Sequence, residues 1–137
     1  MRAVTLSVLL ALACGACRGV RTCTAIGAES GVVFDLSVVL PQYPVDVTAC
    51  LENTCVQQRM STEQSPSIFV QDPTLTGPTV VRVSFIIKGF RDTTAAMQDS
   101  TTVQLHAVEP NGPDCPPLVY QANVDVFADG IHPSPSP

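Results

Sequence analysis

The chain has no tryptophan and few basic residues, and the shortage of positive charge excludes whole classes of partner. Its 137 residues include seven Lys and Arg against twelve Asp and Glu, for a formal net charge of −5. Nucleic acid is bound largely through clustered cations that meet phosphates, and anionic lipid is bound through polybasic patches. The basic residues here are scattered. We therefore expect no nucleic-acid partner, and the mild acidity serves solubility.

The chain also lacks a long hydrophobic run. Its most apolar stretch covers residues 4–13 (VTLSVLLALA), whereas a transmembrane helix needs about 20 apolar residues. Met1 and Arg2 place a positive charge before this stretch, and small residues follow it at once. Charge, apolar run and small residues in this order are the layout of a secretory signal. The pattern predicts a signal peptide at residues 1–16 and an extracytoplasmic protein.

The end of the signal can be read in more than one way. Gly15-Ala16-Cys17 is similar to the end of a bacterial lipobox, in which small residues precede a cysteine that becomes lipidated. Cys14 stands where that motif usually has a bulky aliphatic residue, and Leu12-Ala13-Cys14 is a second candidate with the lipid on Cys14. Ala11-Leu12-Ala13 fits the small-x-small pattern of ordinary signal peptidase, which would release a secreted, soluble protein.

Cysteine parity favours Cys17. The six cysteines stand at positions 14, 17, 23, 50, 55 and 115, and exported domains usually keep their cysteines paired. Cleavage before Cys17, with lipid on that residue, leaves an even number, whereas lipidation of Cys14 leaves an odd one. We therefore expect a lipid anchor at Cys17, with Cys14 as the alternative. Two or more acyl chains hold a protein stably on a membrane.

The four remaining cysteines allow three connectivities. A two-residue turn at Glu52-Asn53 would place Cys50 opposite Cys55 on paired strands, within disulfide reach. Strand alternation puts both cysteines on the polar face, as such a pair requires. Cys23 would then pair with Cys115. A metal site at this spacing is disfavoured, because structural zinc needs a second close pair of ligands and the two histidines are isolated. We expect no metal and no cofactor.

Alternation of apolar and polar residues dominates the chain after Gly31, which is the period-two signature of half-buried strands. Twelve prolines interrupt the chain too often for long helices. We expect an all-β antiparallel sandwich at residues 31–130, after an N-terminal segment at 17–30 and before a Pro/Ser-rich tail at 131–137. Residues 91–99 are interpreted as a helical turn. The seven expected strands lie at 34–40, 45–51, 56–60, 67–71, 81–87, 103–107 and 122–126.

Three short motifs carry a family resemblance: CTAIGA at 23–28 with Gly31-Val32, VTAC at 47–50 with Cys55, and PNGPDC at 110–115 with Pro117. With them the mature chain resembles small lipoprotein-like or secreted domains of Gram-positive actinobacteria. The resemblance implies an Ig-like or transthyretin-like sandwich in the cell envelope. It implies no enzymatic activity.

Motifs of catalysis are absent: the chain has no G-x-S-x-G, no phosphate-binding loop and no H-E-x-x-H. A hydrolase would need His106 or His132 beside a hydroxyl and an acid, and alternation places His106 on a polar, exposed face. We expect a non-catalytic binding or structural module, with a small extracytoplasmic hydrolase as the alternative. Its partners would be the membrane, through the lipid, and an envelope protein or glycan. The candidate contact loops are 57–65, 89–99 and the Asn111-Gly112 corner.

Overall fold

The computed structural model describes residues 23, 28–37, 44–61, 66–89 and 95–135. Within these ranges the protein is all-β. The same part of the chain has no helix that is long and apolar enough to span a membrane. The predicted signal peptide, Cys14 and Cys17 lie outside the described residues, as does most of the predicted N-terminal segment.

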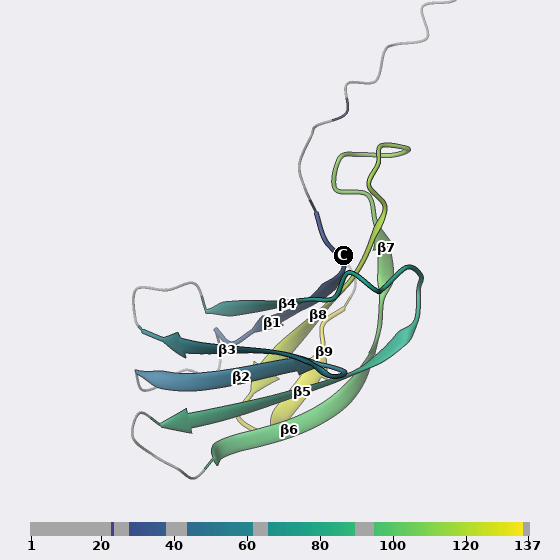
Figure 1. The fold of residues 1–137 in the computed structure, drawn as a ribbon. Coiled ribbons are helices and arrows are strands. Elements are labelled where there is room, and N and C mark those ends of the chain that lie inside the picture. The colour runs from purple at the N-terminus through teal and green to yellow at the C-terminus, as the bar shows by residue number, and fades with distance from the viewer. Residues whose placement is uncertain (1–22, 24–27, 38–43, 62–65, 90–94, 136–137) are drawn as a thin grey trace, which may run out of the picture.

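Two sheets face each other as a β-sandwich (Figure 1). The β1 sheet has the order β4-β1-β8-β7, and β9 also pairs with β8; the β2 sheet has the order β3-β2-β5-β6. All the strand pairs are antiparallel except β1 with β8, which is parallel. The described strands are β1 (Gly31–Asp35), β2 (Val45–Leu51), β3 (Thr54–Met60), β4 (Ser67–Gln71), β5 (Val80–Gly89), β6 (Ala95–Gln104), β7 (His106–Val108), β8 (Val119–Phe127) and β9 (Gly130–Pro133).

The core lies between the sheets and is built by the alternation seen in the sequence. In β2 and β5 every second residue is buried, as a strand with one face on a core requires. Phe34 of β1 and Phe85 of β5 are the largest fully buried side chains, at 0% and 1% exposure. The predicted all-β sandwich is thereby confirmed, with nine described strands in place of seven. Aliphatic side chains complete the core, among them Val32, Leu36, Val47, Leu51, Met60, Ile68, Val70, Val83, Leu105 and Val124.

The β2–β3 hairpin has the predicted geometry. Cys50 and Cys55 are direct cross-strand partners and form a disulfide. The turn is Glu52-Asn53, as expected, with Glu52 at φ 51°. The carboxylate of Glu52 accepts a hydrogen bond from the backbone N–H of Arg82 at 2.6 Å, and its own N–H donates to the Arg82 carbonyl at 2.8 Å. The turn is thus tied to β5 as well as closed by the disulfide.

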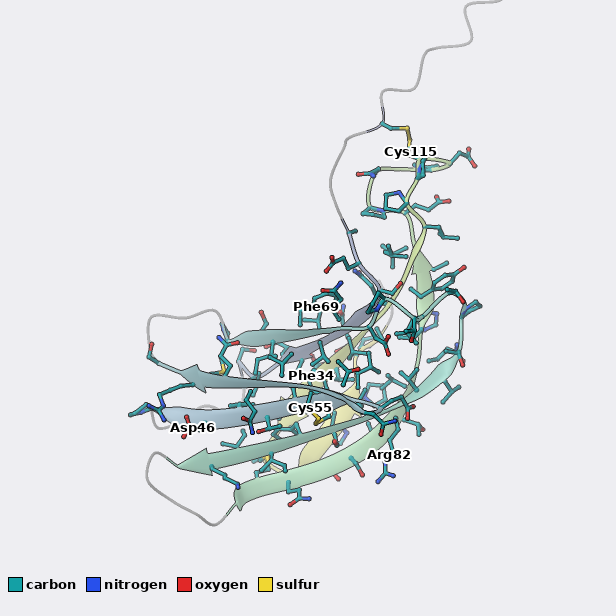
Figure 2. All side chains as sticks on the ribbon, viewed as in Figure 1. Phe34, Asp46, Cys55, Phe69, Arg82 and Cys115 are labelled. Atoms are coloured by element: carbon teal, nitrogen blue, oxygen red, sulfur yellow. A yellow bond between two sulfur atoms is a disulfide. The ribbon has the colours of Figure 1, made fainter. Side chains whose placement is uncertain are left out.

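The second disulfide joins Cys23 to Cys115, as predicted, and lies away from the core. Cys115 is in the connection between β7 and β8, which projects beyond the sheets (Figures 1 and 2); we call residues 109–118 the arm. Asn111 is buried in the arm, and its side-chain amide donates to the carbonyl of Pro116 at 2.7 Å. The disulfide therefore attaches the N-terminal segment to the arm.

The chain passes from one sheet to the other at Leu105. The sequence predicted one strand at 103–107, but β6 ends at Gln104 in the β2 sheet and β7 begins at His106 in the β1 sheet. Leu105 is fully buried, and its N–H donates to the carbonyl of Thr79 at 2.9 Å. Alternation continues unbroken through this crossing, so the pattern could not reveal that the strand changes partners.

One other prediction near the strand ends was wrong, and the predicted Pro/Ser-rich tail begins as an ordered strand. Residues 95–99 belong to β6 and not to a helical turn, because pairing with β5 supplies their backbone hydrogen bonds. The predicted boundary between sandwich and tail at 130–131 falls inside β9, which pairs with β8. In both segments the partner is the preceding strand of a hairpin, and local composition does not show this pairing.

The edges of the two sheets are joined by the side chain of Asp99. Its Oδ2 accepts the backbone N–H of Ile131 in β9 at 2.9 Å, and its Oδ1 accepts the N–H of Ser100 at 2.7 Å. Gly130 makes this approach possible, because a Cβ there would collide with the carboxylate, and its φ of 141° is a conformation that L side chains rarely adopt. An inward-facing carboxylate on an edge strand also discourages pairing with other chains.

We expect Asp99→Asn to change how stability depends on pH. The backbone N–H groups of Ile131 and then Ser100 lower the pKa of Asp99. Its carboxylate therefore stabilises the fold above the unfolded-state pKa of about 3.9, and this contribution is lost as the pH falls through the lower native pKa. The difference in unfolding free energy between wild type and Asp99→Asn should shrink between about pH 5 and pH 3.

Urea unfolding at several pH values measures this difference. Glu109→Gln, which removes an exposed carboxylate of the arm, serves as the control and should leave the pH profile as in wild type. A constant difference between wild type and Asp99→Asn from pH 7 to pH 3 would contradict the role given to Asp99.

The two disulfides should contribute unequally to stability. They close loops with sequence separations of 92 and 5 residues, which the chain-entropy estimate converts to about 4.6 and about 2 kcal/mol. Urea unfolding of Cys23→Ser/Cys115→Ser and of Cys50→Ser/Cys55→Ser should show the larger loss for the first pair. An equal loss, or a Cys23–Cys50 peptide in a non-reducing mass analysis of wild type, would contradict this assignment.

Candidate functional site

The predicted contact loops lie on separate elements. Residues 57–60 belong to β3, Gly89 ends β5, residues 95–99 belong to β6, and Asn111-Gly112 lies in the arm. Ser61 is also described, whereas residues 62–65 and 90–94 of the first two loops lie outside the described residues. The described parts of the first two loops lie at one end of the β2 sheet, because Met60 and Gly89 both pair with Val45, whereas Asn111-Gly112 lies in the arm.

A hollow opens instead at the edge of β8 where β7 and β9 pair with successive parts of this strand, and its lining runs from outward-facing residues of β8 to Val103 and Gln104 of β6. β7 pairs with β8 as far along as Gln121, and β9 pairs with the later part of β8, from Val124 onward. The hollow between them has a volume of about 380 Å³. It is lined by Val103, Gln104, His106, Ala107, Val108, Gln121, Ala122, Asn123, Pro133, Ser134 and Pro135.

A second hollow of about 480 Å³ meets the first at Gln121. It is lined by Ala28, Glu29, Val33 and Phe69 as well as Gln121. In the sheet, Val33 is the partner of Phe69 on one side and of Asn123 on the other. We call these two neighbouring hollows, which share Gln121 as a lining residue, the outer-face groove.

Phe69 is the exposed aromatic residue of the groove, with 38% of its surface accessible. It lies on the side of the β1 sheet opposite Phe34, which points into the core (Figure 2). Gly31 lets the ring lie close to the sheet, because a Cβ at that position would come within 2.8 Å of ring atoms Cε2 and Cζ. The ring thus rests on the backbone of β1.

Gln121 stands at the junction of the two hollows. Its Nε2 donates to the backbone carbonyl of Glu29 at 2.8 Å, which holds the side chain against the start of β1. Ser134, which follows β9, lies beside Asn123 of β8, and its N–H donates to the Asn123 carbonyl at 3.0 Å. The Oγ of Ser134 is buried and has no hydrogen-bond partner among the described residues. Buried hydroxyl groups are normally satisfied, so the Ser134 hydroxyl is an exception among the described residues.

The lining of the groove carries little charge. Glu29, which is exposed, is the one acidic residue among the lining residues, and none of them is Lys or Arg. The remaining polar groups are side-chain amides, the imidazole of His106 and the hydroxyl of Ser134. Such a lining can both donate and accept hydrogen bonds but cannot neutralise a strongly charged ligand.

His106 has the exposure predicted from the sequence. It shares the first hollow with Ser134, but no carboxylate lines that hollow. The other histidine, His132, is 3.2 Å from Asp129 and packs edge-on against Phe127. Among the described residues, no three His, Cys, Asp or Glu side chains are grouped so that they could hold a metal ion.

The groove was not predicted from the sequence, because the candidate contact residues were sought in loops and the groove residues lie on the faces of strands. Two signals were present. Val33 and Phe69 are apolar residues at outward positions of their strands, where alternation otherwise favours polar residues. Gly31, within a strand, indicates a close approach of another group. Neither signal shows that β4 and β8 both lie beside β1.

The chain has no tryptophan, so Phe69→Trp would place a single indole in the groove. We expect its emission to lie between that of a buried and of a fully solvated indole and acrylamide to quench it, because Phe69 is partly exposed. Leu118→Trp, at a site with 51% exposure in the arm, is the control. Emission from Phe69→Trp that resists acrylamide would contradict an open groove.

No protein-family model, no curated protein and no solved structure matches the chain. The interpretation of the outer-face groove therefore depends on its own residues. These are a partly exposed ring seated on glycine, neutral hydrogen-bonding side chains and one unpaired buried hydroxyl.

Proposed function

We propose that this protein is a non-catalytic, exported binding module of the cell envelope, anchored by lipid on Cys17, which holds an envelope ligand in the outer-face groove. The observation that carries the binding role is the groove itself, which combines apolar surface with neutral hydrogen-bonding groups. Ligand sites are typically concave, mostly apolar and furnished with a few polar groups that orient the ligand. Both hollows are within the usual range of about 300–1,000 Å³.

The cysteines support export. All four cysteines in the described part of the chain are joined in two disulfides. Disulfides form and persist in oxidising compartments and are rare in the cytosol. The signal-like order of residues 1–16 points to the same location.

The long disulfide determines where an anchor at Cys17 would place the domain. Cys23 is bonded to the arm and follows Cys17 by six positions in the sequence. Six residues span at most about 20 Å. Lipid on Cys17 would therefore hold the arm close to the membrane, while the sandwich that carries the groove extends from the other end of the arm (Figure 1).

The lining of the groove favours binding over hydrolysis. A Ser-His hydrolase needs the imidazole hydrogen-bonded to the hydroxyl and oriented by an acid. His106 and Ser134 line one hollow, but the described contacts include neither a hydrogen bond between them nor a carboxylate beside His106. The groove can thus hold a ligand without the groups that would activate a nucleophile.

We also propose that the sandwich is Ig-like or transthyretin-like and that it is related to actinobacterial lipoprotein-like domains. The order β3-β2-β5-β6, with β1 and β4 paired in the facing sheet, supports the Ig-like form, in which strands C′, C, F and G face B and E. The parallel pairing of β8 with β1 departs from that form.

The anchor is tested by expressing the full chain in a bacterium that processes lipoproteins and separating detergent and aqueous phases. We expect wild type in the detergent phase and Cys17→Ala in the aqueous phase, because loss of the acyl chains removes stable membrane binding. Cys14→Ala is the matched control and should behave as wild type.

Two results would contradict the anchor at Cys17. Equal partition of wild type and Cys17→Ala into detergent would refute lipidation of that residue. Loss of anchoring only in Cys14→Ala would move the lipid to the alternative position, and a wild-type protein found wholly in the medium would favour the secreted form.

A further inference from the structure

We propose that the ligand of the outer-face groove is a neutral glycan, with one sugar ring stacked on Phe69 and hydroxyl groups of the glycan bound by Gln121 and Asn123. This inference rests on the proposed binding function and names its ligand class. It is carried by three features of the groove: its charge, the seat of the Phe69 ring, and the type and placement of its polar groups.

The charge of the groove argues for an uncharged ligand. No Lys or Arg lines either hollow, so a phosphate, sulfate or polyanionic chain would find no cation. A cation would find only the exposed Glu29 at one end. Burying a charge without a partner is costly. A neutral ligand that forms many hydrogen bonds fits this lining best.

The Phe69 ring offers a flat apolar platform. The ring lies over Gly31, where a side chain would displace it, and 38% of the residue remains accessible. The face of an aromatic ring carries partial negative charge and attracts polarised hydrogens. The C–H face of a pyranose meets these requirements, because it is flat, apolar and carries weakly positive hydrogens.

Two side-chain amides project from β8, which is separated from the strand of Phe69 by β1. Gln121 uses its Nε2 to bind the Glu29 carbonyl, which holds its Oε1 in place as an acceptor. Asn123 is exposed on the outer face as the strand partner of Val33. Sugar hydroxyls both donate and accept, so they can pair with amide groups.

An extended peptide fits less well. Peptides that add a strand to a sheet need an open strand edge for main-chain hydrogen bonds, whereas the groove runs across the face of the β1 sheet. The short gap between β7 and β9 along β8 is already occupied, because the Ser134 N–H donates to the Asn123 carbonyl there. A peptide would therefore lose its main source of affinity.

The probes for the test are uncharged oligosaccharides: maltohexaose, cellohexaose, mannohexaose and chitohexaose. Each is titrated by calorimetry into the full chain. Heparin hexasaccharide represents an anionic glycan, and an uncharged Ser/Asn/Val hexapeptide represents an extended peptide. We expect at least one uncharged oligosaccharide to bind and the anionic glycan and the peptide not to bind. Fluorescence of Phe69→Trp should report the same titration by a shift in emission.

The variants identify the contacts. Phe69→Ala should weaken binding by about tenfold, through loss of ring stacking. Gln121→Leu, which keeps the size but removes the amide, should weaken it by roughly threefold to tenfold. Leu118→Ala, which trims an apolar residue with 51% exposure in the arm that lines neither hollow, is the matched control and should bind as wild type. Urea unfolding verifies that each variant is folded.

The outcomes separate the ligand class from the binding function. Binding of the peptide or of heparin alone, abolished by Phe69→Ala, would overturn the glycan while supporting the groove. Uncharged glycan binding that is equal in wild type, Phe69→Ala and Gln121→Leu would overturn the stacking geometry. Absence of binding to every uncharged oligosaccharide overturns the glycan inference, and the proposed location is then judged separately by the Cys17→Ala fractionation.

Discussion

The carboxylate of Asp99 joins the edges of the two sheets, and the outer-face groove depends on this contact. By accepting the N–H of Ile131, Asp99 holds β9 beside the edge of β6 while β9 pairs with β8. Because β9 is held there, Pro133 and Ser134 lie opposite β7 and form one wall of the groove. Gly130 is required for the same reason, since a side chain there would collide with the carboxylate. One polar contact thus links the closure of the sandwich to the shape of its candidate site.

The outer faces of the two sheets differ in chemistry, which is why the proposed binding site involves only one of them. The β2 sheet presents the Cys50–Cys55 disulfide and the ion pair between Arg59 and Asp46, whose Nε and Oδ1 atoms are 2.8 Å apart. Arg59 lowers the pKa of Asp46 by a direct hydrogen bond, as expected for an exposed charged pair. The β1 sheet instead exposes the ring of Phe69 beside neutral amides. An exposed aromatic ring with hydrogen-bonding neighbours is a surface on which a ligand replaces water favourably.

Much of the fold could be predicted because its main signals are local. The burial of alternate residues in β2 and β5 follows directly from period two. The opposition of Cys50 and Cys55 follows from a two-residue turn and from their common face. The crossing at Leu105 and the strand at 95–99 could not be predicted, because each depends on a partner strand that the local pattern does not specify. The groove was missed for a related reason: Val33, Phe69 and Gln121 come from three strands whose adjacency is a property of the whole sheet.

The sequence by itself determined the strand periodicity, the turn at Glu52-Asn53 and the pairing of the cysteines, since side-chain direction along a strand and the reach of a disulfide are set over a few residues. Only the tertiary structure decided which strands are neighbours, that β8 runs parallel to β1, and that β7 and β9 divide one edge of β8 between them. These arrangements depend on burying the inner faces of both sheets together, with the core residues contributed by the whole described chain. That burial brings Phe69, Gln121 and Ser134, which lie far apart in the sequence, to a single groove.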